Sequence, residues 1–199
     1  MKQGFVKVAS ATPRIRVADP VYNAQVICEQ AKEAAEHGAK IVVFPELCIT
    51  GYTCNDLFLQ ELLLEKAKEA LLTIAEETGQ LETLFLVGLP VDKDGRLYNV
   101  AAVLYRGRIL GMIPKKNIPM YAEFYEGRHF TPGEETVTEY RLGKQVIPFG
   151  SNLLFRCEEL PELILGCELC EDLWVAEPPS TSHALMGATV IANLWASNE

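Results

Sequence analysis

The sequence lacks any long apolar run and any strongly basic segment. No apolar stretch among its 199 residues approaches the ~18 residues that a membrane-spanning helix needs. Its first residues contain no apolar core of the kind that a secretory signal requires. The net charge is −9, and no basic run is interleaved with aromatic residues, which argues against a phosphate-binding surface. We therefore expect a cytoplasmic protein with no membrane and no nucleic-acid partner.

Cysteine and histidine are also scarce. Six cysteines are too few to cross-link a domain of this size, so reduced thiols are expected. Cys167 and Cys170 form a Cys-x-x-Cys pair, but no second pair of that spacing accompanies it, and the three histidines follow no ligand pattern. We therefore expect no metal site. A metal or redox module that also uses Cys48 and Cys54 stays the weaker alternative.

Strand-like and helix-like patterns alternate along the chain. Asp19 followed by Pro20 is typical of a helix start, and the apolar spacing that follows predicts a helix as far as Gly38. A second helix is predicted over residues 55–79 and a short one near residues 182–186. Strands are predicted at residues 5–9, 41–44, 84–88, 163–168 and 189–194, with a hairpin of residues 99–113 that turns at Arg106-Gly107. This mixture indicates a layered α/β fold.

Three predicted strands each end at a reactive side chain. Glu46 follows residues 41–44, Lys115 follows the hairpin, and Cys170 follows residues 163–168. A carboxylate, an ammonium group and a thiol together can activate a sulfur nucleophile and stabilise an oxyanion. Taken singly, each signal is weak: a Glu after a strand is more often a solvated loop charge, Lys116 competes with Lys115, and most cysteines only pack.

The combination resembles the signatures of the nitrilase (carbon–nitrogen hydrolase) superfamily. The matching segments are Phe44-Pro45-Glu46-Leu47, then residues 114–121 with 123–128 and Pro132-Gly133, then Cys170-Glu171-Asp172-Leu173-Trp174. Within that superfamily, residues 51–58 and 193–198 are similar to the glutaminase domain of glutamine-dependent NAD(+) synthetases. Two departures stand out. Asn117-Ile118 replaces a frequent His-Leu, and Trp195 replaces a small residue, which would narrow or perturb the mouth of the pocket.

The resemblance implies a fold and a catalytic triad. The fold is a four-layer α-β-β-α sandwich that pairs with a second copy, so we expect a homo-oligomer. The triad is Glu46, Lys115 and Cys170: Glu46 takes the proton of the thiol, and Lys115 stabilises the oxyanion together with the backbone N–H of Glu171. Lys115 is preferred to Lys116 because it directly follows the proline and precedes Tyr121 by six residues.

The resemblance also implies the substrate and the residues around it. Glutamine would be hydrolysed to glutamate and ammonia, and the glutaminase step needs no cofactor. Glu126 would be a second carboxylate that orients Lys115. The side chains expected to line the glutamine pocket are Tyr121, Glu171, Trp174 and Ser197.

In the full-length enzymes of this kind, the ammonia would serve a synthetase domain that amidates deamido-NAD with ATP and magnesium. No Ser-Gly-Gly-like pyrophosphate loop occurs in residues 1–199. We therefore expect residues 1–199 to be one glutaminase domain, truncated at the C-terminus, with the synthetase domain absent. Two alternatives remain open: a stand-alone amidase or carbamoylase of the same superfamily, and an inactive fragment with an open pocket.

Overall fold

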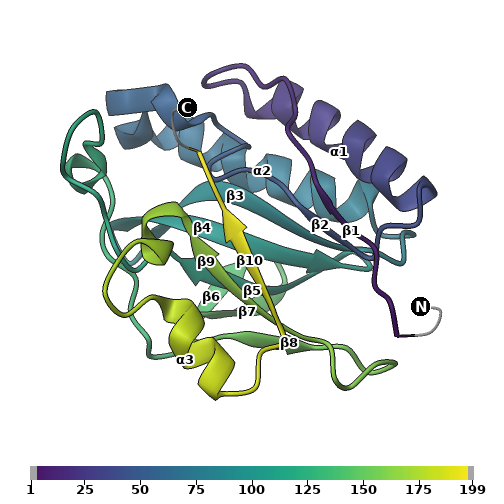
Figure 1. Ribbon diagram of the computed structural model, residues 1–199. Helices are drawn as coiled ribbons and strands as arrows, with labels where there is room; N and C mark the ends of the chain where they lie inside the picture. Colours follow the sequence, from purple (N-terminus) through teal and green to yellow (C-terminus); the bar gives the residue numbers. More distant parts are fainter. Residues whose placement is uncertain (1–3, 197–199) are drawn as a thin grey trace.

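Two β-sheets pack face to face between layers of helices (Figure 1). The computed structural model describes residues 4–196. The large sheet has the strand order β1-β2-β3-β4-β5-β7-β6 and the small sheet the order β10-β9-β8. Helices α1 and α2 cover the outer face of the large sheet, and α3 lies on the outer face of the small one. This is the α-β-β-α order of layers that the sequence predicts.

The elements follow one another along the chain with short connections. The large sheet consists of β1 (Val8–Ser10), β2 (Ile41–Val43), β3 (Leu84–Lys93), β4 (Arg96–Tyr105), β5 (Arg108–Pro114), β6 (Thr138–Leu142) and β7 (Gln145–Phe149). The small sheet consists of β8 (Leu154–Arg156), β9 (Ile164–Leu169) and β10 (Val190–Leu194). The α-helices are α1 (Pro20–Glu36), α2 (Glu61–Glu77) and α3 (Pro179–Leu185), and the 3-10 helices are η1 (Tyr52–Leu59), η2 (Glu126–Arg128) and η3 (Cys170–Leu173).

Strand β4 is buried on both faces and joins the two halves of the core. Val100 and Ala102 pack with the residues of α1 and α2, whereas Ala101 and Val103 pack against the small sheet. Because side chains alternate across a strand, a continuous apolar run is what a central strand of a sandwich requires. A buried polar residue in such a strand is therefore unusual, and β4 contains Asn99, which is fully buried.

The first helix and the hairpin agree with the sequence prediction. The Asp19 carboxylate accepts a hydrogen bond from the backbone N–H of Tyr22 at 3.1 Å and so caps α1. Gly38 follows the helix with a φ of +83°. Strands β4 and β5 pair in antiparallel fashion around Arg106 and Gly107, which both have positive φ.

The second helix differs from the prediction of a single helix over residues 55–79. Residues 52–59 form η1, and α2 begins only at Glu61, because Gln60 is extended with φ −88° and ψ 121°. Asn55 has a φ of 49°, a left-handed conformation that asparagine tolerates better than most residues. The predicted short helix also begins earlier than expected, at Pro179.

Three strands were not predicted, and the limits of several others differ from the prediction. β6, β7 and β8 are short; β6 and β7 each bury two side chains, and β8 buries none fully. β3 continues to Lys93, well beyond the predicted end at Gly88, and β1 starts at Val8 instead of residue 5. Within residues 4–196, no helix combines the length and the apolar character needed to cross a bilayer.

Candidate active site

Glu46 lies in a tight turn immediately after β2. Its side chain is 1% exposed. Leu47 adopts a φ of 53°, and the turn packs directly against the backbone of β3 at Gly88. A Cβ atom at Gly88 would lie 2.3 Å from the backbone nitrogen of Leu47 and 2.7 Å from the carbonyl oxygen of Pro45. Glycine at this position therefore allows the turn to hold Glu46 inside the protein.

Lys115 follows β5 and is completely buried. Its backbone N–H donates to the carbonyl of Asn99 at 2.8 Å, and its carbonyl accepts from the backbone N–H of Gly133 at 2.7 Å. The ammonium nitrogen lies 2.7 Å from Glu46 Oε1 and 2.6 Å from Glu126 Oε1. One cation thus serves two buried carboxylates.

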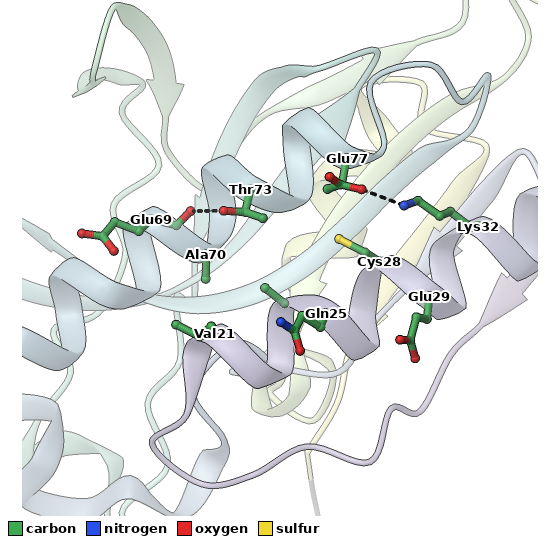
Figure 2. Close-up of a pocket in the computed structure, with 10 residues that line it drawn as sticks. Val21, Gln25, Cys28, Glu29, Lys32, Glu69, Ala70, Thr73 and Glu77 are labelled. Carbon is green, nitrogen blue, oxygen red and sulfur yellow. Dashed lines mark hydrogen bonds and ion pairs between the residues drawn. The ribbon is translucent and has the colours of Figure 1, made fainter.

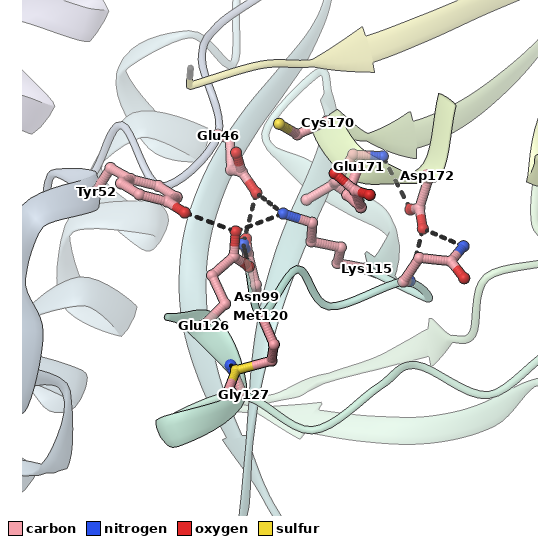
Figure 3. A network of polar contacts seen from close by, with 12 residues as sticks. Glu46, Tyr52, Asn99, Lys115, Met120, Glu126, Gly127, Cys170, Glu171 and Asp172 are labelled. Atoms are coloured by element: carbon pink, nitrogen blue, oxygen red, sulfur yellow. Dashed lines mark hydrogen bonds and ion pairs between the residues drawn. The ribbon is translucent and has the colours of Figure 1, made fainter. Parts of the chain in front are cut away.

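Cys170 lies where β9 ends and η3 begins. Its φ is +42°, which is uncommon for a residue with a side chain and typical of positions under functional constraint. Its backbone N–H donates to Asn193 Oδ1 on β10 at 3.0 Å. Figure 3 shows the thiol on the same side as the Glu46 carboxylate and the Lys115 ammonium group. The structure thus brings the three predicted side chains together.

Two residues that the sequence reasoning missed complete this network (Figure 3). Asn99 Nδ2 donates to Glu46 Oε1 at 2.7 Å and to Glu126 Oε2 at 3.3 Å. The Tyr52 hydroxyl donates to Glu126 Oε1 at 2.8 Å. The sequence carried a signal for each. Asn99 interrupts an apolar strand, and Tyr52 belongs to the segment 51–58 that resembles the glutaminases.

The buried network contains two carboxylates, those of Glu46 and Glu126, but only one ammonium group, that of Lys115. Burial raises the pKa of Glu46 to about 7, although the Lys115 ammonium group opposes the shift. Burial would lower the pKa of Lys115, but Glu46 and Glu126 outweigh it and raise that pKa to about 12. Because two carboxylates share one ammonium group, the cluster carries a net negative charge when both are ionised. Lys115 therefore stays charged, and Glu46 is the group able to exchange a proton near neutral pH.

The thiol itself is held in its neutral form. Burial, reinforced by the negative charge of Glu46, raises the pKa of Cys170 to about 12. Lys115 and a hydrogen bond from the backbone N–H of Ala196 act in the opposite direction. A thiol of this kind needs a base to become a nucleophile. Glu46, whose raised pKa lets it accept a proton near neutral pH, can act as that base.

The loop after β5 is tied to the turn that carries Cys170 by Asp172. The buried carboxylate of Asp172 accepts backbone hydrogen bonds from Leu169 and Asn117, and burial raises its pKa. It thereby fixes the loop of Lys115 relative to that turn.

The residues expected around the substrate are divided between the protein surface and the interior. The Tyr121 hydroxyl donates to Glu171 Oε2 at 2.7 Å, at the protein surface. Trp174 is 63% exposed and packs edge-on against Trp195, with ring centroids 5.5 Å apart. Glu126 lies deeper, against Lys115. Ser197 lies outside the described residues. Lys116 points away from the site and pairs with Glu135 near the surface.

A hollow of about 420 Å³ lies between α1 and α2 and shares no lining residue with this network (Figure 2). It also contains a thiol, an amine and a carboxylate, those of Cys28, Lys32 and Glu77. However, Lys32 and Glu77 are about half exposed, so solvent screens their ion pair. Burial raises the pKa of Cys28 to about 11. This hollow therefore lacks the buried, charged environment that activates a nucleophile.

Metal binding has no support in the described geometry. All six cysteines are free thiols. Within residues 4–196, no group of three or more His, Cys, Asp or Glu side chains is arranged to hold a metal ion.

Comparison with known proteins places this geometry in a family. Residues 7–199 match the family described as carbon-nitrogen hydrolase. The glutamine-dependent NAD(+) synthetase of Mycobacterium tuberculosis strain H37Rv is 41% identical over 196 residues, which are 98% of this chain and 29% of the relative. The synthetase of Thermotoga maritima is 34% identical over 198 residues, covering 99% of this chain and 31% of the relative. The chain thus spans less than a third of the length of these relatives.

Solved structures give the same result for the fold. A crystal structure of a glutamine-dependent NAD(+) synthetase from Cytophaga hutchinsonii superposes with a TM-score of 0.85 at 29% identity, over 96% of this chain and 30% of that one. A mutant amidase from Nesterenkonia sp. AN1, with the acetamide moiety of fluoroacetamide added covalently at its active-site cysteine, superposes with a TM-score of 0.75 at 20% identity, over 98% of this chain and 67% of that one. With the match over residues 7–199, this chain belongs to the carbon–nitrogen hydrolase family of enzymes.

Proposed function

We propose that this chain is a glutaminase that releases ammonia from glutamine through a thioester at Cys170. The observation that carries the proposal is the buried cluster of Lys115 between Glu46 and Glu126, beside a thiol in a left-handed conformation. The choice of glutamine is supported by the similarity to glutamine-dependent NAD(+) synthetases along nearly the whole chain.

The first step forms the nucleophile. Glu46 accepts the proton of the Cys170 thiol, and the sulfur attacks the side-chain carboxamide carbon of glutamine. The carbonyl π electrons move to the oxygen, which becomes an oxyanion. Lys115 Nζ and the backbone N–H of Glu171 donate to it. Preorganised donors of this kind each supply about 3–4 kcal/mol of transition-state stabilisation.

The second step releases ammonia. The tetrahedral intermediate collapses, its carbon–nitrogen bond breaks, and protonated Glu46 returns the proton to the departing nitrogen. A glutamyl thioester remains on Cys170. Glu46, again ionised, then takes a proton from a water molecule that attacks the thioester carbonyl. The carbon–sulfur bond then breaks, glutamate leaves, and Glu46 returns the proton to the Cys170 sulfur, which regenerates the thiol. No cofactor is needed for either half of the reaction.

The remaining assignments concern recognition and the longer enzymes. Glu126 orients Lys115, and Tyr121, Glu171 and Trp174 face the substrate. Ser197, which lies outside the described residues, stays an expected pocket residue. In a longer protein the ammonia would serve ATP- and magnesium-dependent amidation of deamido-NAD. We assign no described residue of this chain to the binding of ATP, magnesium or deamido-NAD. A homo-oligomer remains our expectation, which light scattering on the purified chain measures.

The test is glutamine hydrolysis by the purified chain and by Cys170→Ala. We expect glutamate and ammonia in equal amounts from the unaltered chain and none from the variant. Mass spectrometry after rapid quenching should find a glutamyl adduct on Cys170. Cys157→Ala removes a half-buried thiol elsewhere and should retain full activity. Hydrolysis that survives Cys170→Ala, or faster hydrolysis of a short aliphatic amide than of glutamine, would overturn the proposal.

A further inference from the structure

The two oxygens of Glu46 have different surroundings. Oε1 accepts hydrogen bonds from Lys115 Nζ and Asn99 Nδ2, each at 2.7 Å. Oε2 is equally buried but has no hydrogen-bond partner among the described residues. Buried polar atoms are nearly always paired, so an unpaired carboxylate oxygen requires an explanation. Both protein donors, Lys115 Nζ and Asn99 Nδ2, bond to Oε1. Since Oε1 is occupied by two donors, Oε2 is the Glu46 oxygen that can accept a further proton.

The orientation of the Asn99 amide follows from its neighbours. Its Nδ2 faces carboxylate oxygens of both Glu46 and Glu126, at 2.7 and 3.3 Å. A flipped amide would place Oδ1 against two anions, so only the observed orientation is stable. Asn99 is neutral and therefore donates to both carboxylates without adding charge. A lysine here would cancel the remaining negative charge of the cluster, and an aspartate would add a third anion.

The backbone holds Asn99 in place. It lies in β4, paired on one side with Pro90 of β3. On the other side its carbonyl accepts the backbone N–H of Lys115 at 2.8 Å. The same residue therefore determines where Lys115 leaves β5 and where the Glu46 carboxylate is anchored.

We propose that Asn99 is a positioning residue that makes Glu46 Oε2 the base: together with Lys115 it occupies Oε1 and leaves Oε2 as the one free oxygen for the Cys170 proton. This inference rests on the proposed role of Glu46. The hydrogen bond from Asn99 also favours the ionised carboxylate and so offsets part of the rise in the Glu46 pKa that burial causes. Asn99 thus keeps the base both aligned and able to accept a proton.

The variants that test this are Asn99→Leu, which removes the amide at similar volume, and Asn99→Ser, which is smaller and guards against a folding failure of the first. Two measurements apply to each: the pH dependence of glutamine hydrolysis, and the pH dependence of Cys170 alkylation by iodoacetamide. We expect kcat to fall at least about tenfold with KM within about twofold, because Asn99 lies behind the carboxylates. The acidic limb of both profiles should move to higher pH, because Glu46 loses a bond that favours its charged form.

The control is Thr83→Val. It removes another buried side-chain donor, the Thr83 hydroxyl that donates to the Ala39 carbonyl at 2.7 Å, from outside the site. Its acidic limb should stay in place. The proposal is overturned if Asn99→Leu and Asn99→Ser keep the acidic limb of the parent chain, or if Thr83→Val shifts it equally.

The same design separates this inference from the proposed function. If the chain hydrolyses no glutamine, the glutaminase proposal fails, yet the alkylation profile still measures the base that serves Cys170. Glu46→Gln should abolish the acidic limb of that profile near neutral pH. A shift in Asn99→Leu then supports the role of Asn99, and an unshifted limb overturns it.

Discussion

Asp172 Oδ1 accepts two hydrogen bonds from Asn117, one from its backbone N–H at 2.7 Å and one from its side-chain amide at 2.9 Å. The other carboxylate oxygen accepts from the backbone N–H of Leu169 at 3.1 Å and that of Lys116 at 3.4 Å. One buried side chain therefore holds the loop that follows Lys115 against the turn that presents Cys170. The relative position of the Lys115 ammonium group and the Cys170 thiol therefore depends on Asp172, which carries neither group.

Asp172→Ala should damage both stability and turnover. The substitution leaves backbone donors of both segments without their acceptor, which costs about 1–3 kcal/mol for a buried group. We expect the free energy of unfolding in urea to fall by about that amount and kcat to fall more than KM rises. Glu159→Ala, at an exposed carboxylate outside the site, should change neither quantity. An Asp172→Ala variant with unaltered kcat would show that the two segments hold their places without this carboxylate.

Lys115 and Lys116 should respond very differently to substitution by methionine. Lys115→Met leaves the carboxylates of Glu46 and Glu126 buried without a cation, and breaking such a pair costs about 3–5 kcal/mol. It also removes the ammonium group proposed to face the oxyanion, so activity should vanish. Lys116→Met breaks only a solvent-screened pair with Glu135, so unfolding and turnover should change little.

Urea unfolding and glutaminase assays on both lysine variants check this prediction. Circular dichroism must first show that Lys115→Met is folded under the assay conditions. An active Lys115→Met, or an inactive Lys116→Met with normal stability, would mean that the assignment of the amine to Lys115 is off by one residue.

The parts of the fold governed by local patterns could be predicted from the sequence. Asp19-Pro20 and the apolar spacing after it locate α1, and Arg106-Gly107 locates the turn between β4 and β5. The convergence of Glu46, Lys115 and Cys170 was expected because the motifs that contain them together resemble the carbon–nitrogen hydrolase signatures. Within the large sheet, β2 and β5 run in the same direction, so Glu46 and Lys115 follow strands that end at the same edge.

The rest depends on contacts between distant segments. β6, β7 and β8 span only three to five residues and bury at most two side chains each, so their apolar alternation is too short to be recognised in the sequence. The role of Asn99 arises from two carboxylates 53 and 27 residues away in the sequence. The break at Gln60 follows from backbone geometry that helix-forming neighbours do not reveal. Three-dimensional packing, not local preference, decides these features.

The pH dependence of turnover should reflect Glu46 instead of the thiol. Burial raises the Glu46 pKa from its ordinary 4.5 to about 7, and a base works only when deprotonated. The value of kcat/KM for glutamine should therefore rise with pH through about 7 and fall as Glu46 becomes protonated below it. The thiol, with a pKa of about 12, contributes no limb in this range. An acidic limb near the ordinary glutamate value would contradict a buried base.

The only two tryptophans of the chain contact each other beside the short helix that begins at Cys170. Trp195 lies two residues beyond Asn193, whose side chain accepts the backbone N–H of Cys170. Its ring meets that of Trp174 edge-on, at an interplanar angle of 82°. Since both indoles are partly exposed, with 63% and 41% of their surfaces open, they are available to a ligand that enters toward the thiol.

Trp195→Ser should therefore change substrate binding more than chemistry. An edge-on aromatic pair is worth about 0.5–1.5 kcal/mol, so its loss frees Trp174 and should raise KM for glutamine roughly two- to tenfold. The value of kcat should stay close to that of the unaltered chain, because neither ring touches the proton-transfer groups. Glutamine added to Cys170→Ala should shift the indole emission, and the shift should shrink when Trp195 is also replaced. Leu185→Ser, at another exposed apolar side chain, serves as the control. If KM for glutamine is unchanged and glutamine does not shift the indole emission, Trp174 and Trp195 do not line the substrate pocket.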